Sequence, residues 1–326
     1  MIRPTYTNLH NIPLALAVWL VNDDYDYQPE ENYISITGLM KPLRQIILSG
    51  RPSAGTAEQP DLSDLAARAL GNSIHDSVEK AWVKNYVKNL QRLGYPDEVI
   101  ARVRVNPSEE ELQTVKDIVP VYIEQRAKKQ IGKWTVGGKF DMVAEGIVHD
   151  NKSTSAYTWV YGGKDGDYKL QGSLYKWLNP DKIFADFIRI NFVFTDWAKA
   201  QARQNPNYPQ ARCQALEIPL MEIDEADAWI RNKLSLVEKY IDAPEKDIPH
   251  CTDEELWLPK PSYKYYADPT KTSGRSTKNS ETLAEAREYQ ASKGGKGIII
   301  TVQDPPNRCG YCEAFANCTQ KDAYFS

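Results

Sequence analysis

Two short stretches decide the fold of this chain: Gly138-Lys139-Phe140-Asp141 and Asp150-Asn151-Lys152. We predict two strands here, joined by a tight turn at Ala144-Glu145-Gly146. Side chains alternate between the faces of a strand, so Asp150 and Lys152 point the same way and Asp141 reaches them from the neighbouring strand. Two carboxylates and a lysine at the open end of a hairpin would hold Mg²⁺ and place an activated water against a phosphate. The alternative is a surface hairpin with an ordinary ion pair.

Two flanking segments carry polar side chains at helical spacing. The segment from Tyr168 to Leu178 has an apolar face, and Gln171 and Tyr175 lie one turn apart on the adjacent face. The segment from Gly71 to Glu79 also has a helical pattern and offers His75 on a polar face. Taken alone, such a histidine is more often structural than a metal ligand, Gln171 is a solvated residue and Tyr175 a half-buried anchor.

Taken together, the motifs resemble those of a known family. In chain order they are Gly-x-x-x-His on a helix, Gly-x-x-Asp, Asp-x-Lys and Gln-x-x-x-Tyr, and this order is similar to the RecB-type branch of the PD-(D/E)XK nucleases. The branch includes the nuclease domains of bacterial RecBCD and AddAB, CRISPR-associated exonucleases with an iron–sulfur cluster, and many phage nucleases. The resemblance runs from about Ile34 to Tyr175, and to Cys318 with the cysteines; Ser35 and Thr37 match the Ser-x-Thr start of the family's opening helix. The fold it implies is α/β, a restriction-endonuclease-like mixed sheet flanked by helices, with a C-terminal cysteine-cluster region.

The resemblance implies a role for each residue of the metal site. Asp141 and Asp150 would bind Mg²⁺ or Mn²⁺, and His75 would be a further metal ligand or would hold a metal-bound water. Lys152 would be the catalytic lysine. The second acid is an aspartate, Asp150, where the family accepts Asp or Glu.

Other polar residues receive weaker assignments. The resemblance implies that Gln171 and Tyr175 position the DNA strand or Lys152. Glu124 is expected on a helix from Val115 to Lys129, where it could add one more acid to the metal shell. Three further residues near the site in sequence are expected at the surface: Glu79, Glu145 and His149.

The chain has five cysteines, an odd number. Cys309, Cys312 and Cys318 form C-x₂-C-x₅-C, and Cys251 can complete four thiolates for a [4Fe–4S] cluster or a tetrahedral Zn²⁺. The spacing matches the C-terminal end of the iron–sulfur nucleases that the chain resembles, and we favour iron–sulfur over zinc. Those relatives usually place their first cysteine before the core, whereas Cys251 follows it. Cys213 is expected to be a buried free thiol in a strand.

Composition places the chain among folded globular proteins. Its 326 residues are 41% hydrophobic and 10% aromatic, and no stretch approaches the length of a membrane span. Because Met1–Pro4 does not begin a basic-then-apolar leader, we expect a reducing compartment, the cytoplasm, or the host cytoplasm if the protein is phage-encoded.

The net charge of −4 argues against a general DNA coat protein, but local basic segments are compatible with DNA binding. One such segment comprises Arg126-Ala127-Lys128-Lys129, Lys133 and Lys139. The other interleaves basic and aromatic residues, which suits phosphates and unstacked bases; the alternative is a solvated loop. It comprises Lys260, Lys264, Lys271, Arg275 and Lys278, with Tyr263, Tyr265 and Tyr266.

We predict three regions: an N-terminal segment packed on the core (1–60), a nuclease core (61–245) and a C-terminal cluster region (246–326). The core is expected to contain helices at 62–93 with a possible break at Gly71, at 109–129 and around Leu170, and strands at 134–143, 147–153, 187–195 and 211–219. The cysteines would then close a long loop from Pro259 to Asn307.

The expected function is a metal-dependent DNA nuclease. The resemblance implies an exonuclease acting on DNA ends or single strands, in phage recombination, replication or DNA degradation, with a recombination or helicase protein as a possible partner. The alternative is a catalytically silent nuclease-fold module that binds DNA or a protein and is stabilised by a zinc or iron–sulfur site.

Overall fold

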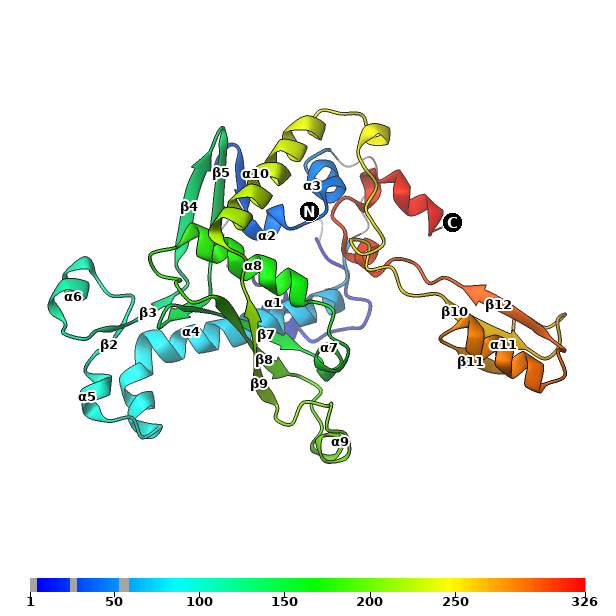
Figure 1. Ribbon diagram of the computed structural model, residues 1–326, viewed down its shortest axis with the longest axis horizontal. Coiled ribbons are helices and arrows are strands. Elements are labelled where there is room, and N and C mark those ends of the chain that lie inside the picture. The colour runs from blue at the N-terminus through cyan, green and yellow to red at the C-terminus, as the bar shows by residue number, and fades with distance from the viewer. Residues whose placement is uncertain (1–4, 24–27, 53–58, 326) are drawn as a thin grey trace. The chain divides into compact units, whose positions relative to one another are not determined.

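The computed structural model describes residues 5–23, 28–52 and 59–325 (Figure 1). The chain forms two compact units, one of Met1–Met40 and Glu58–Ser235 and the other of Lys41–Ala57 and Leu236–Ser326. Met1–Pro4, on which the expectation of no leader rests, lies outside the described residues. No helix in the described part of the chain has the length and hydrophobicity needed to cross a bilayer.

The first unit is built around a mixed six-stranded sheet in the order β2-β3-β6-β7-β8-β9. The pairs β2/β3 and β7/β8 are parallel and the others are antiparallel, so the predicted α/β class with a mixed sheet is confirmed. The strands are β2 (Val103–Val105), β3 (Val119–Ile123), β6 (Met142–Ala144), β7 (Ile147–Thr154), β8 (Phe187–Phe194) and β9 (Cys213–Pro219). A second, three-stranded sheet has the order β1-β5-β4, with β1 (Tyr33–Ser35), β5 (Trp134–Lys139) and β4 (Arg126–Ile131).

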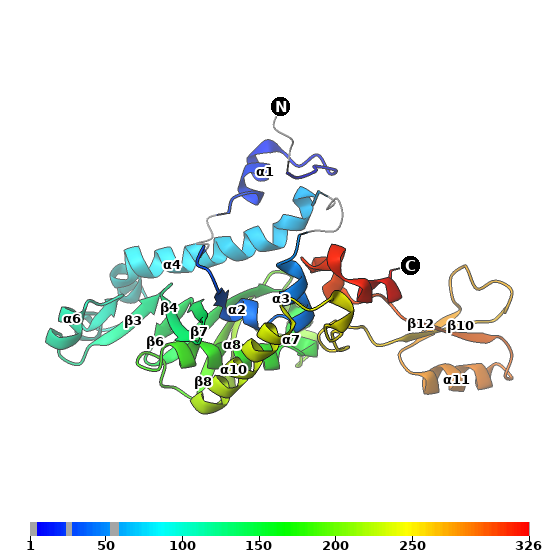
Figure 2. The same cartoon turned by 90° about the horizontal axis from the view of Figure 1, so that it is seen from above.

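The two long helices of this unit cover opposite faces of the six-stranded sheet (Figure 2). Gly71 of α4 (Ala66–Arg92) faces the Ser153 side chain, and Gln171 of α8 (Asp165–Leu178) reaches Asp150. Residues 150 and 153 point to opposite faces because side chains alternate along β7. α4 is continuous over 27 residues and does not break at Gly71.

The remaining helices of the first unit are short. They are α1 (Leu14–Leu20), α2 (Ile36–Leu39), α5 (Asp97–Ile100), α6 (Glu109–Thr114), α7 (Ala156–Tyr161) and α9 (Lys199–Gln204). The boundary between the two units lies within α10 (Ile223–Tyr240): the first unit ends at Ser235, and the second resumes at Leu236.

The predicted helix from Glu109 to Lys129 is wrong. A capping box between Ser108 and Glu111 starts α6, but the helix ends at Thr114 and the chain continues as β3 and β4. Pro120 lacks the N–H that a helix interior needs, and the β-branched residues around it pack better on a sheet. The strand expected over 134–143 is likewise two strands, β5 and β6, separated at Phe140 and Asp141.

The second unit contains α3 (Leu43–Ser49), the segment that carries four cysteines, and a small module inserted between Cys251 and Cys309. The module is an antiparallel sheet in the order β11-β10-β12 with one helix. Its elements are β10 (Ser262–Tyr266), β11 (Lys278–Ser280), α11 (Leu283–Ser292) and β12 (Ile298–Val302). Short 3₁₀ turns follow at Asn307–Tyr311, Phe315–Asn317 and Thr319–Ala323.

Candidate functional site

A polar cleft of about 540 Å³ opens in the first unit between α2, α4, the β3–β4 turn and the β5–β6 connection. The cleft brings together residues that are far apart in the sequence. Its ionisable lining residues are His75, Asp76, Glu79, Glu124, Arg126, Lys139, Asp141 and Tyr175.

Three of these residues form a compact ligand set. One ligand atom from each of His75, Glu124 and Asp141 lies within 4.8 Å of the other two, and no other such set of His, Cys, Asp or Glu occurs among the residues that the structure describes. His75 Nδ1 lies 3.2 Å from Asp141 Oδ2, which also accepts a 2.9 Å hydrogen bond from the Asn151 N–H. An imidazole with two carboxylates is a donor set that fits a divalent cation.

Glu124 joins this set from a place that the sequence did not predict. It lies in the turn between β3 and β4, with φ of 52°, and not on a helix. Its N–H donates to the Asp141 carbonyl (3.0 Å), and its carboxylate pairs with Lys139 Nζ at 2.5 Å. A positive φ is uncommon for a glutamate and here reflects the tight turn that the residue occupies.

The environment of Asp141 favours a cation. Burial, then the nearby Asp150 carboxylate, raises the pKa of Asp141 to about 6, against the lowering effects of His75 and Lys152. Two carboxylates in one partly buried place repel each other unless a proton or a positive ion lies between them.

Asp150 is the most buried acid of the site, with 2% of its surface exposed. Its Oδ2 lies 2.6 Å from Lys152 Nζ in an ion pair without hydrogen-bond alignment, and its Oδ1 accepts a long 3.4 Å bond from Gln171 Nε2. The same Gln171 nitrogen donates to the Tyr175 hydroxyl (3.3 Å), which donates to the Lys139 carbonyl (2.9 Å). Burial raises the pKa of Tyr175 far above its usual value, so this phenol keeps its proton.

The structure therefore brings the predicted nuclease residues into one neighbourhood. The residues expected at the surface behave differently from one another: Glu145 is exposed in the β6–β7 turn and Glu79 is exposed at the cleft, but His149 is half-buried. His149 Nδ1 lies 3.4 Å from Asn191 Nδ2, and burial, followed by the charge of Arg189, lowers its pKa to about 4. The expectation for His149 is thus wrong.

The sequence reasoning also missed Asp76. This exposed carboxylate follows His75 on α4 and lines the same cleft. Its position directly after a candidate ligand histidine is the signal that could have identified it.

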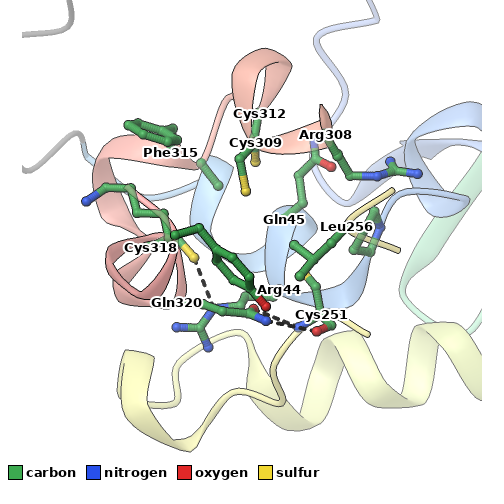
Figure 3. A pocket seen from close by; sticks show the side chains of 14 residues that line it. Arg44, Gln45, Cys251, Leu256, Arg308, Cys309, Cys312, Phe315, Cys318 and Gln320 are labelled. Carbon is green, nitrogen blue, oxygen red and sulfur yellow. Dashed lines mark hydrogen bonds between the residues drawn. The ribbon is translucent and has the colours of Figure 1, made fainter. Parts of the chain in front are cut away.

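The four predicted cluster cysteines converge in the second unit (Figure 3). Cys309, Cys312 and Cys318 come from the C-terminal turns, and Cys251 follows the segment after α10. Together they line a small, mostly apolar cavity of about 30 Å³. Gln320 fixes Cys251 by accepting from its N–H and donating to its carbonyl, both at 2.8 Å.

Arg44 of α3 is the buried cation beside these thiols, with 2% of its surface exposed. Its Nε donates to Cys318 Sγ at 3.2 Å, and one of its terminal nitrogens donates to the carbonyls of Ile248 (2.8 Å) and Glu245 (3.3 Å). Its other terminal nitrogen forms an ion pair with the Glu245 carboxylate. The Glu245 carboxylate in turn accepts from the N–H and hydroxyl of Thr319. These contacts join α3 to the tail at the cysteines.

Burial favours the neutral form of three of these thiols, Cys251, Cys309 and Cys312. Burial, then Glu255, raises the pKa of Cys251 to about 12, and burial also raises the pKa of Cys309 and of Cys312. No three of the thiol sulfurs, all of which the structure describes, lie within 4.8 Å of one another. Four converging thiols are a donor set that either a tetrahedral zinc or an iron–sulfur cluster can use.

Cys213 does not join the cluster. It opens β9, as predicted, but its side chain is exposed, so the expectation of a buried thiol is wrong. β9 is the edge strand of the six-stranded sheet, and only Ile218 along it is buried.

Comparisons with known proteins give only weak similarities. No protein-family model matches the chain, and no curated protein matches it. Among solved structures, the chain resembles SSO0001 at 15% identity and a TM-score of 0.37, covering 68% of this chain and 84% of that one. It resembles a phage-related exonuclease from Haemophilus somnus 129PT at 15% identity and a TM-score of 0.27, covering 61% and 92%. Scores at this level do not assign a function, so the site itself must carry the proposal.

Proposed function

We propose that this protein is a Mg²⁺- or Mn²⁺-dependent deoxyribonuclease, an exonuclease that acts on DNA ends or single strands. The observation that carries the proposal is the convergence of His75, Glu124 and Asp141 beside the Asp150–Lys152 pair. Support also comes from the order of the motifs along the chain, which resembles that of RecB-type nucleases. The Asp150–Lys152 pair beside the ligand set also supports chemistry over a silent binding module.

The residues fit such a cation. When bound, it would neutralise charge on the phosphate and lower the pKa of a coordinated water. His75, Glu124 and Asp141 would hold it, and Asp150 can join them through the oxygen that now faces Lys152. The Lys152 ammonium would then be free to donate its protons to oxygens at the phosphate, where negative charge builds during hydrolysis.

The helix α8 supplies positioning. Gln171 is within reach of both Asp150 and Tyr175, so it can hold the carboxylate in place when Lys152 leaves it. Tyr175 is fixed to the Lys139 carbonyl and stays protonated. We assign both residues to orienting the site and not to proton transfer.

For the second unit we propose a [4Fe–4S] cluster bound by Cys251, Cys309, Cys312 and Cys318, with a structural role. The C-x₂-C-x₅-C spacing, which resembles that of the iron–sulfur nucleases, supports this over the zinc alternative. The Arg44 hydrogen bond to Cys318 Sγ also fits a negatively charged thiolate cluster.

The decisive experiment is incubation of end-labelled single- and double-stranded DNA with Mg²⁺ or Mn²⁺. Wild type should shorten the DNA, and Asp150→Ala and Lys152→Ala should each lower the rate about 10²-fold or more. Cleavage by Lys152→Ala at the wild-type rate would overturn the assigned mechanism. Binding of DNA by wild type without cleavage under any metal would favour the catalytically silent module.

A further inference from the structure

The inserted module of the second unit, residues 259–307, carries the inference. The basic segment around β4 and β5 is largely engaged within its own unit: Lys128 pairs with Glu30, Lys139 pairs with Glu124, and Lys129 lies over the Trp177 ring. The basic segment of the module has a different environment, and none of its residues belongs to either proposed metal site.

The tyrosines of the module build its interior. Tyr265 and Tyr266 are 2% and 7% exposed. The Tyr265 ring packs edge-on against Tyr289 of α11, with centroids 5.2 Å apart, and its hydroxyl donates to the Lys296 carbonyl at 2.9 Å. The sequence-based expectation that these rings stack on DNA bases is therefore wrong for Tyr265 and Tyr266, and none of the module's tyrosines is exposed.

The cations of the same segment remain available. Between positions 260 and 280 there are five lysines and arginines and one acid, Asp268, a local charge of +4 in a chain of −4. Asp268 pairs with Lys271 at 3.6 Å. The other four have no carboxylate within 4.0 Å among the described residues, and all but the half-buried Lys264 are exposed; they are Lys260, Lys264, Arg275 and Lys278.

Charge is separated across the three-stranded sheet. Tyr265 faces α11, so its neighbour Lys264 points to the opposite, helix-free face, which it shares with its cross-strand partner Asn279. The long connection from β10 to β11, which carries Arg275, lies on the side of the sheet away from α11 (Figure 2). The acids Glu281, Glu285 and Glu288 lie on the other side, along α11. Lys278, the cross-strand partner of Tyr265, lines the same hollow as these acids and is therefore not part of the helix-free face.

We propose that this basic face, defined by Lys260, Lys264 and Arg275, binds the sugar–phosphate backbone of DNA as a contact outside the catalytic cleft. The inference rests on the proposed function for its choice of polyanion. Unpaired, exposed cations without exposed rings predict contacts to phosphates and not to bases, so binding should be independent of sequence and strongly dependent on salt.

The test uses the full-length protein without divalent metal, so that DNA is not cut, and a fluorescent single-stranded oligonucleotide read by anisotropy. Neutralising Lys260, Lys264 and Arg275 to Gln should weaken binding at least tenfold at low salt. The slope of log K against log salt should shrink by about 0.7 for each lost phosphate contact. Arg287→Gln removes an exposed cation from α11 in the same module and should leave affinity and slope unchanged.

The outcomes separate the two proposals. An unchanged affinity and slope in the three-residue variant would overturn the inference even if the protein cleaves DNA, and so would an equal loss in Arg287→Gln. Weaker binding in a chain that cuts no DNA would keep the inference and remove the nuclease. If the three-residue variant does not fold, Arg275→Glu is measured in its place. This single change in an exposed connection should also reduce both affinity and slope.

Discussion

At the scale of single residues, the protonation of Asp141 should decide when the site accepts a cation. Its pKa is raised to about 6 by burial and by Asp150, so at lower pH the carboxyl is neutral and a poor ligand. In the folded, metal-free protein this group holds its proton more tightly than in the unfolded chain. Its contribution to stability is therefore present below about pH 4 and is lost as the pH rises to about 6.

We predict that Mn²⁺ affinity rises with pH through about 6, and that at pH 5 it is about tenfold weaker than at pH 7. Calorimetric titration in buffers of different ionisation enthalpy would show the affinity and the released proton together. His75→Gln should move the midpoint upward, because the His75 charge now lowers the Asp141 pKa. An affinity that stays constant from pH 5 to pH 7 in the wild type would contradict the prediction.

Glu124 provides a second test at this scale, and Glu145 is its matched control. Both are glutamates in turns with φ of 52°, but only Glu124 lies in the ligand set. Glu124→Gln should lower Mn²⁺ affinity severalfold because a charged ligand is lost, and Glu145→Gln should leave it unchanged. Equal affinities for the two variants would remove Glu124 from the metal site.

The residues of the site differ in how far the sequence could locate them. Asp150 and Lys152 follow from alternation along one strand, and Gln171 and Tyr175 follow from the spacing of one helix turn, so local rules were enough. Glu124 was considered but placed on a helix, because its true position depends on the turn between β3 and β4. That turn forms through pairing with distant strands, which local patterns do not report.

At the scale of elements, the same limit explains which helices and strands could be predicted. β8 was found because Ile188, Ile190 and Phe192 alternate with less buried residues. The stretch after α6 has the charge pattern of a helix, but parallel pairing of β3 with β2 and antiparallel pairing with β6 override that local preference. Non-local pairing also separates β5 from β6, which bends the chain at Asp141 toward His75.

The packing of α8 on the sheet depends on a glycine, and a second glycine in the same helix is its control. A Cβ on Gly172 would lie 2.8 Å from the Ile188 Cβ and 2.7 Å from Leu220 Cδ2, whereas a Cβ on Gly166 would meet nothing within 4 Å. Gly172→Ala should destabilise the protein by about 1–3 kcal/mol through overpacking. Gly166→Ala should be neutral or stabilise it by up to ~1 kcal/mol.

Chemical denaturation of the two variants measures this difference, and Gly172→Ala should also lower nuclease activity because α8 carries Gln171 and Tyr175. If both variants had the stability of the wild type, the close approach of α8 to β8 would not be as the structure describes it.

At the scale of the whole molecule, the His75, Glu124 and Asp141 set and the four cysteines of the cavity lie in different compact units. The second unit combines Lys41–Ala57 with the C-terminal segment, so its parts are joined across a long stretch of sequence. The four cysteines that the sequence grouped line one cavity. The sequence could not identify Arg44, because an arginine of a short helix far from the cysteines carries no motif.

The cysteines therefore give the last prediction, a loss of stability confined to one unit. Cys318→Ser should release the bound metal and lower the melting temperature, because metal-binding energy is folding energy here. Cys213→Ser should change neither quantity, since this exposed thiol lies in the other unit. Hydrogen exchange should then increase in α3 and in the C-terminal turns, and stay unchanged in α4 and β7.

Anaerobic purification with metal and sulfide counts identifies the group. About four irons and four sulfides per chain support the [4Fe–4S] cluster, whereas one zinc supports the alternative.

Arg44→Lys keeps the charge but loses the Nε–H···Sγ bond, so it should shift the cluster's reduction potential or its lability to oxygen. Arg51→Lys is its control, because Arg51 donates to the carbonyls of Ile241 and Ala243 and to no cysteine. Full stability without any bound metal would show that these thiols bind nothing, and Arg44 would then hold α3 to the tail by hydrogen bonds alone.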